Sequence, residues 1–292
     1  MGAYIAQECK LMGIHFNFAP VVDVNSNPLN PIINVRSYGE IFSNVSEKGL
    51  AMMKGMQDFG VLACAKHFPG HGDTEFDSHK TLPIIKHSKH RIDSVEIVPF
   101  KHLIDQGVAS VMIAHLNIPS LDSVENRAST LSPFVVDTML RQQLNFSGLV
   151  FTDALNMKGV TSFYSSGQLE VEALKAGNDI LLFSENIPVA FTAIKKAIKD
   201  SVLTIERINQ SCHKILKAKE WLGISYSSPI DTLNVLKKIQ NTSFKLLKHE
   251  LEKSALTLVK NVDDLLPLED VNDNIFSLTL GDSESNDFIK QL

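Results

Sequence analysis

The sequence predicts an α/β protein of the TIM-type (β/α)8-barrel class, and three observations support this. Short apolar, β-branched runs alternate along the chain with amphipathic stretches of helical period. The sequence contains no GxGxxG fingerprint of a doubly wound dinucleotide fold. Polar residues stand at or near the ends of successive apolar runs. In chain order they are Asp23, then Lys66 with His67, then His115, and then Asp153. Polar side chains at one strand end after another are typical of a barrel, whose active site lies at the carboxyl ends of its strands.

Five apolar runs predict buried parallel strands at residues 15–24, 61–67, 110–116, 148–154 and 179–183. The stretches between them predict helices at residues 45–59, 94–106, 133–144 and 167–176. A complete barrel has eight strands. Residues 4–10 read as a helix without a capping residue. We therefore expect the N-terminal strands of the barrel to be absent from this sequence.

The last third of the chain predicts a boundary between two domains. A long helix is expected at residues 203–222, with Thr204 as its cap and Gly223 at its end. Residues 225–229 are polar and read as a linker. A helix at 234–257, a turn at 261–267 and a strand at 275–280 follow. We assign residues 1–224 to a partial barrel and residues 225–292 to a linker and the beginning of a second α/β domain.

Composition narrows the classes of partner. The chain is 44% hydrophobic and 21% charged, as in ordinary globular proteins. Its net charge of -5 gives no basic surplus for nucleic acid, and no apolar run approaches the roughly 20 residues of a membrane span. Cys9, Cys64 and Cys212 are widely spaced and predict small buried hydrophobes, with neither a disulfide framework nor a zinc site. A small neutral or acidic ligand fits this composition.

The segment most informative about chemistry is residues 66–79, which reads Lys-His-Phe-Pro-Gly-His-Gly-Asp-Thr-Glu-Phe-Asp-Ser-His. Two glycines and a proline take the chain out of regular structure directly after a predicted strand. Its many polar side chains then crowd into one short loop. A loop of this kind suits catalysis better than packing.

This segment resembles the signature of the bacterial N-acetylglucosaminidases of glycoside hydrolase family 3. The resemblance extends to Asn-Phe-Ala-Pro-Val-Val-Asp-Val at residues 17–24, to Arg-Ser-Tyr at 36–38 and to Phe-Thr-Asp-Ala-Leu-Asn-Met at 151–157. Together the motifs cover roughly residues 5–182 in order. The resemblance also implies that the second domain is the α/β sandwich of the family.

The resemblance implies a retaining hydrolysis of terminal N-acetyl-β-glucosaminides without a cofactor. Asp153 is implied as the nucleophile that forms a glycosyl intermediate. His79 is implied as the acid/base, and Asp77 as the group that orients it. Histidine has an unperturbed pKa near 6.5, which suits proton transfer around neutrality. Asp153 follows the apolar residues 149–151, so its carboxylate needs a cationic partner or a pocket.

The residues expected to surround the sugar come from several strand ends. The resemblance implies that Arg36, Lys66 and His67 hold its hydroxyl groups. His115 and Asp23 are further candidates, because they also close predicted strands. The expected substrate is an oligosaccharide or muropeptide that contains N-acetylglucosamine, as in peptidoglycan recycling. The sequence leaves open whether the compartment is a bacterial cytoplasm or periplasm.

Other functions stay open at this stage. The family also contains β-glucosidases and phosphorylases. The family motif Asp-Gln-Glu-Gly-Gly-Arg is absent from this sequence, so an inactive sugar-binding fragment is a further alternative. A metal-dependent barrel hydrolase is a more distant alternative. It is considered because five residues of the loop are of the types that bind metal ions, namely His67, His71, Asp73, Asp77 and His79. Their spacing matches neither an HxH pair on the first strand nor an HExxH helix, so we expect no metal.

Overall fold

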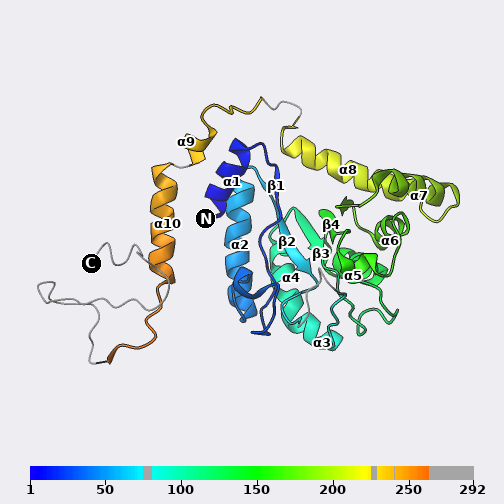
Figure 1. The fold of residues 1–292 in the computed structure, drawn as a ribbon, viewed down its shortest axis with the longest axis horizontal. Coiled ribbons are helices and arrows are strands. Elements are labelled where there is room, and N and C mark those ends of the chain that lie inside the picture. The colour runs from blue at the N-terminus through cyan, green and yellow to red at the C-terminus, as the bar shows by residue number, and fades with distance from the viewer. Residues whose placement is uncertain (75–80, 225–228, 240, 263–292) are drawn as a thin grey trace, which may run out of the picture. The chain divides into compact units, whose positions relative to one another are not determined.

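The computed structural model describes residues 1–74, 81–224, 229–239 and 241–262 (Figure 1). The chain divides into two compact units, residues 1–244 and 245–292. In the second unit the described residues are 245–262, which include most of helix α10 (Thr242–Ala255). The strand expected at 275–280 lies outside the described residues. The sheet and the candidate site belong to the first unit.

The first unit is built on five parallel strands, and each strand pairs with the next one along the chain (Figure 1). They are β1 (Phe16–Asn17), β2 (Leu62–Phe68), β3 (Ser110–Ile113), β4 (Leu149–Ala154) and β5 (Ile180–Leu182). A doubly wound sheet would reverse its strand order at a switch point. The observed order has no reversal, and the sheet is a curled parallel wall. The α/β class is confirmed.

Strand β1 is much shorter than the run expected at residues 15–24. The N–H of Ala19 turns back to the carbonyl of Asn17 at 2.8 Å, which ends the regular ladder. Pro20 has no N–H to restore it. The chain still lies along β2, because Val21 forms an isolated bridge with Lys66. The prediction of one continuous strand here is wrong.

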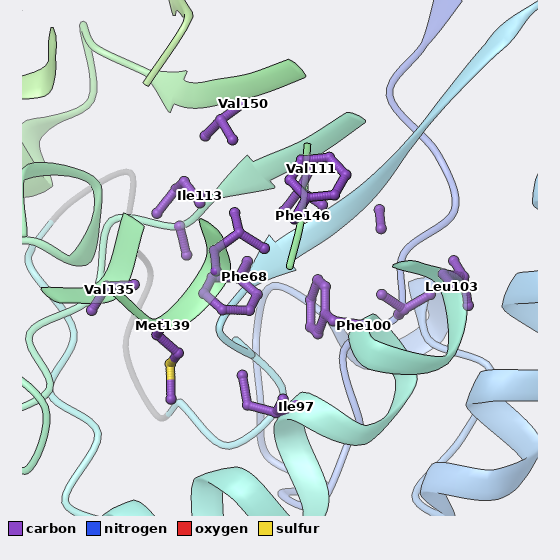
Figure 2. Close-up of a cluster of buried hydrophobic side chains, with 14 of the residues drawn as sticks. Phe68, Ile97, Phe100, Leu103, Val111, Ile113, Val135, Met139, Phe146 and Val150 are labelled. Carbon is purple, nitrogen blue, oxygen red and sulfur yellow. The ribbon is translucent and has the colours of Figure 1, made fainter. Parts of the chain in front are cut away.

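Helices cover one face of the sheet and form the main core. They include α2 (Phe42–Asp58), α4 (Ile97–Asp105) and the π-helical η4 (Phe134–Gln143), which lie close to the predicted spans. Figure 2 shows Phe68 and Val111 from the sheet beside Phe100 from α4 and Met139 from η4. The rings of Phe68 and Phe100 meet edge to face, with centroids 5.3 Å apart.

The opposite face of the sheet carries the alternate residues of the same strands. Cys64, Met112, Leu149 and Phe151 point to this side, and α8 (Ile205–Trp221) packs Ile215 against them. Helix α8 begins as predicted, since the Thr204 side chain accepts a hydrogen bond from the backbone N–H of Arg207 at 3.2 Å. Helix α6 (Gln168–Ala176) also confirms its prediction.

Other elements depart from expectation. Helix α7 (Ile187–Lys199) was not predicted, although Asn186 caps it by accepting from the N–H of Val189 and Pro188 stands in its first turn. The single helix expected at 234–257 is wrong. Asn241 accepts from the N–H of Phe244 at 2.9 Å and starts α10 anew after α9 (Val235–Ile239). Cys212 is exposed, contrary to its expected burial.

The remaining described elements are short except for the first helix. The chain begins with α1 (Gly2–Leu11), which confirms the helix expected at 4–10. The short ones are η1 (Asn34–Arg36), α3 (Lys89–Arg91), η2 (Ile92–Glu96), η3 (Ser129–Leu131) and α5 (Lys158–Thr161). Helix α3 and the π-helical η2 run directly into α4, so the helical stretch begins earlier than the predicted residue 94.

Candidate active site

The parallel strands bring four of the predicted site residues to one edge of the sheet. Asp23 follows β1, His67 lies near the end of β2, His115 comes two residues after β3, and Asp153 is the fifth residue of β4. Because all five strands point the same way, their carboxyl ends share this edge.

Asp23 is fully buried and binds two histidine residues of the loop that follows β2. It accepts hydrogen bonds from the backbone N–H of His67 at 3.1 Å and of His71 at 2.7 Å. Its Oδ2 also lies 2.8 Å from Nδ1 of the His67 ring. Burial alone raises the pKa of Asp23, but its attraction to His67 and His71 and these hydrogen bonds lower the pKa overall. Asp23 therefore holds the loop as a carboxylate.

A second buried side chain, that of Asn30, also holds the loop that follows β2. The Asn30 side chain donates to the carbonyl of His71 at 2.8 Å and accepts from the backbone N–H of Ile33. Gly72 permits the close approach, because a Cβ at this position would stand 1.9 Å from the carbonyl oxygen of Val24. His71 and Gly72 are therefore held against the segment after β1.

His71 lies inside this packing, and its Nδ1 is 2.9 Å from the hydroxyl of Thr74. Burial, reinforced by the charge of His67, lowers the pKa of His71 from 6.5 to about 4 against the attraction of Asp23 and Asp153. As the pH falls, His71 therefore binds a proton in the unfolded chain at a higher pH than in the folded protein.

We expect the protein to lose stability between pH 6.5 and about 4, by on the order of 3 kcal/mol from His71 alone. Urea unfolding across this range measures the loss. The substitution His71→Asn should flatten the slope, and His90→Asn at an exposed position should leave it unchanged. Asp23 contributes at lower pH, since its pKa lies below 3.8 in the fold. An equal slope in wild type and His71→Asn would contradict the assignment.

Asp153 is half-buried, and three histidines lie close enough to act on its charge. Its Oδ1 accepts a hydrogen bond from the backbone N–H of Ala154 at 2.8 Å. Burial raises the pKa of Asp153, but the charges of His67, His115 and His71 together with this hydrogen bond bring it below 3.8. The Asp153 carboxylate is therefore ionised at neutral pH.

His115 is completely buried and fixes the end of β4. Its Nδ1 lies 2.7 Å from the hydroxyl of Thr130, and its Nε2 lies 3.0 Å from the carbonyl oxygen of Ala154. A carbonyl only accepts, so Nε2 carries the hydrogen in this contact. The ring thus holds the backbone beside the Asp153 carboxylate. Sequence reasoning missed Thr130, because its partners lie 15 and 16 residues away in the chain.

The two predicted cationic sugar ligands lie on neighbouring segments. Lys66 is half-buried near the end of β2. Burial and the charge of Arg36 lower the pKa of Lys66, whereas Asp153 and Asp23 partly oppose this. Arg36 ends η1, is exposed, and donates to the carbonyl of Ile32 at 3.2 Å. Both cations are thus in electrostatic reach of the site.

The predicted acid/base His79 and its partner Asp77 lie outside the described residues. Within the part of the chain that is described, no group of three or more His, Cys, Asp or Glu side chains is arranged to hold a metal ion.

Comparison with known families identifies this architecture. Residues 1–218 match the model described as the glycosyl hydrolase family 3 N terminal domain. The chain belongs to glycosyl hydrolase family 3. This family 3 chain is 36% identical over 303 residues to "Beta-hexosaminidase A" of Pseudoalteromonas piscicida, a match that covers 96% of the chain and 49% of the relative. It therefore spans about half the length of this curated relative.

Two solved structures resemble the family 3 chain closely. A glycoside hydrolase family 3 beta-N-acetylglucosaminidase from Paenibacillus sp. str. FPU-7 superimposes with a TM-score of 0.75 at 36% identity, over 81% of this chain and 48% of that one. The beta-glucoside phosphorylase BglX gives a TM-score of 0.84 at 27% identity, over 91% of this chain and 51% of the other. Among the described residues, no helix has both the length and the apolar character needed to cross a membrane.

Proposed function

We propose that the protein hydrolyses terminal N-acetyl-β-glucosaminides with retention of configuration. The observation that carries the proposal is Asp153, an ionised and half-buried carboxylate at the carboxyl edge of a parallel sheet. The positive charges of His67, His115 and Lys66 act on this carboxylate and attract it. The family match and the hexosaminidase relatives support the same reaction.

The proposed reaction has two displacements at the anomeric carbon. In the first, Asp153 forms a bond to this carbon while the glycosidic bond breaks, and His79 gives its proton to the departing oxygen. Asp77 accepts a hydrogen bond from the histidine and stabilises its charged form. In the second, His79 removes a proton from water, the water oxygen bonds to the anomeric carbon, and the Asp153 carboxylate leaves.

The remaining polar groups bind the sugar in this proposal. Lys66 and Arg36 donate hydrogen bonds to its hydroxyl oxygens. The Nδ1 side of His67 faces Asp23, so the opposite nitrogen, Nε2, is the one that meets the sugar. Asp23 and His115 are already bonded to protein groups and act as supports. No step needs a cofactor.

The domain organisation and the natural substrate are part of the same proposal. We propose that residues 1–224 form part of a (β/α)8 barrel and that residues 225–292 contain a linker and the beginning of an α/β sandwich domain. The natural substrate is then a muropeptide or a chitin-derived oligosaccharide. Phosphorolysis is the second candidate, and the likeness to the beta-glucoside phosphorylase BglX favours it.

Turnover of two chromogenic substrates tests the proposal. We expect 4-nitrophenyl N-acetyl-β-glucosaminide to be cleaved at least about tenfold more efficiently than the β-glucoside, because a site that hydrogen-bonds the acetamide loses that bond with glucose. The sugar product should be N-acetylglucosamine whether or not inorganic phosphate is added to the assay. A sugar 1-phosphate would establish phosphorolysis instead. If 4-nitrophenol is released from neither substrate, the result would favour an inactive sugar-binding protein.

A further inference from the structure

A cavity of about 390 Å³ lies at the amino edge of the sheet, opposite the edge that carries Asp153. Leu62 at the start of β2 and Leu149 at the start of β4 form part of its lining. Helix α8 supplies another side, with Lys214 and Trp221. The volume lies near the lower end of the range of about 300 to 1,000 Å³ that small-molecule sites occupy, which favours a ligand with a single ring.

The part of the cavity beside β3 is held in place by helix α2. The Gln57 side chain donates to the carbonyl of Gly107 at 3.0 Å and accepts from the backbone N–H of Ala109 at 2.9 Å. The carbonyl of Ala109 in turn accepts from the N–H of Leu149 at 3.1 Å. All four residues line the cavity. Binding there therefore orders little backbone, which favours affinity.

A cluster of three cations lies beside the cavity around the carboxylate of Asp179. The Asp179 side chain is fully buried, and its oxygens lie 2.5 Å from Arg141, 3.4 Å from Arg207 and 3.5 Å from Lys214. Arg141 also donates to the carbonyl of Gly148 at 2.6 Å, and Gly148 lines the cavity. The cluster therefore adjoins the same wall that a ligand would contact.

The charges of this cluster do not balance. Burial raises the pKa of Asp179, but Arg141 and the other partners of the carboxylate lower it overall, so Asp179 is ionised at neutral pH. One carboxylate among three cations leaves two positive charges unmatched. Asp137 also attracts Arg141, but it is exposed, and solvent screens its charge.

The surplus charge is felt at Lys214. Burial lowers the pKa of Lys214, the attraction of Asp179 opposes this, and Arg141 and Arg207 lower the pKa further. The net shift is downward, so the charged form of Lys214 is stabilised less than it is in water. An anion placed beside Lys214 would reverse this effect.

Lys214 is the member of the cluster that lines the cavity. Its side chain is only 29% exposed. An ammonium group has three N–H donors, so one contact with Asp179 leaves donors for a ligand. Lys217, three residues further along α8, lines the same cavity. Among the described residues of the lining, none is acidic.

The apolar part of the lining suits a ring. Trp221 leaves 56% of its surface exposed, whereas Leu62 and Leu149 beside it are buried. An indole offers a large, flat apolar surface on which a ring can pack. The cavity thus offers an apolar surface and a cationic group to one small molecule.

We propose that this cavity binds a phosphorylated monosaccharide, with the phosphate on Lys214 and the sugar ring on Trp221. A phosphate monoester carries a charge of about −1.5 to −2 at pH 7 and so matches the two unmatched positive charges. A carboxylate would neutralise only one of them. The site lies at the opposite edge from Asp153, so the proposal does not depend on the proposed hydrolysis.

Fluorescence titration with glucose 6-phosphate tests the proposal, because Trp221 is the only tryptophan of the chain. We expect its emission to change with a Kd below about 1 mM. Glucose and inorganic phosphate each lack half of the ligand and should bind at least about tenfold more weakly. Glucuronate, which carries a carboxylate in place of the phosphate, should also bind more weakly. Asp153→Asn should leave the Kd unchanged.

Three variants locate the ligand. Lys214→Gln should weaken binding of glucose 6-phosphate about tenfold, because it removes a charged hydrogen-bond donor. Lys217→Gln should weaken it about twofold to threefold, and this residue has no contact with Asp179 whose loss could disturb the fold. Lys219→Gln is the matched control, since Lys219 is an exposed lysine of α8 that does not line the cavity. Thermal unfolding checks that each variant is folded.

The proposal is overturned if neither the fluorescence nor titration calorimetry detects glucose 6-phosphate up to about 10 mM. Glucuronate bound as tightly as glucose 6-phosphate would reject the phosphate, and inorganic phosphate bound as tightly would reject the contact with the ring. An unchanged Kd in folded Lys214→Gln, or in Lys217→Gln if Lys214→Gln does not fold, would reject this cavity as the site. Loss of binding in Asp153→Asn would place the ligand at the catalytic edge instead.

Discussion

The substitution Asp153→Asn is expected to lower kcat for N-acetyl-β-glucosaminide cleavage by at least about a thousandfold. The amide has no charge with which to attack the anomeric carbon or to stabilise the positive charge that develops there. Its oxygen still accepts the hydrogen bond from the Ala154 N–H that Asp153 accepts now. The fold should therefore survive, and thermal unfolding checks this alongside the release of 4-nitrophenol.

Two further variants make the nucleophile test specific. Asp137→Asn introduces the same chemical change at an exposed residue of η4 and should retain wild-type turnover. Asp153→Gly leaves room for azide, which should restore cleavage of an activated aryl substrate and yield the α-glycosyl azide. Activity of Asp153→Asn within tenfold of wild type would reject the nucleophile assignment.

The substitution His79→Ala is expected to lower kcat/KM by an amount that depends on the leaving group. A disaccharide, whose departing oxygen needs a proton, should lose about a hundredfold to ten-thousandfold. A 2,4-dinitrophenyl glycoside leaves without help and should lose little. Plotted against the leaving-group pKa for a series of aryl glycosides, log kcat/KM should fall more steeply in the variant than in wild type.

His90→Ala is the control for this test, because His90 is an exposed histidine of the same stretch of chain. Added azide should also accelerate turnover of the dinitrophenyl substrate by His79→Ala, since azide attacks the intermediate without a general base. Equal losses on activated and unactivated substrates would point to a structural role for His79.

Local patterns in the sequence predicted four of the five strands well. The apolar runs that became β2, β3, β4 and β5 are continuous, and their pairing partners are the adjacent runs. The prediction failed at β1, where Pro20 and the turn at Ala19 interrupt the ladder within an apolar run. Helix α7 was missed although its Asn-x-Pro start is a recognisable signal.

The support of the site was much harder to predict than its reactive residues. Asp23 was a candidate because it closes a predicted strand, but its bonds to His67 and His71 span 44 and 48 residues. No periodicity or spacing encodes contacts of that range. The same holds for Asn30, whose bond to the His71 carbonyl spans 41 residues. Such roles depend on how distant segments pack and emerge only in the folded chain.

The strand order also bears on how the protein is made. In the described sheet, each strand from β2 to β5 pairs with the strand synthesised just before it. A chain emerging from the ribosome can therefore extend its sheet one neighbour at a time, without waiting for a distant partner. In this order the contact of Asp23 with His67 can form before Asp153, on β4, has been synthesised. The loop that Asp23 holds can thus be in place before the Asp153 carboxylate beside it is synthesised.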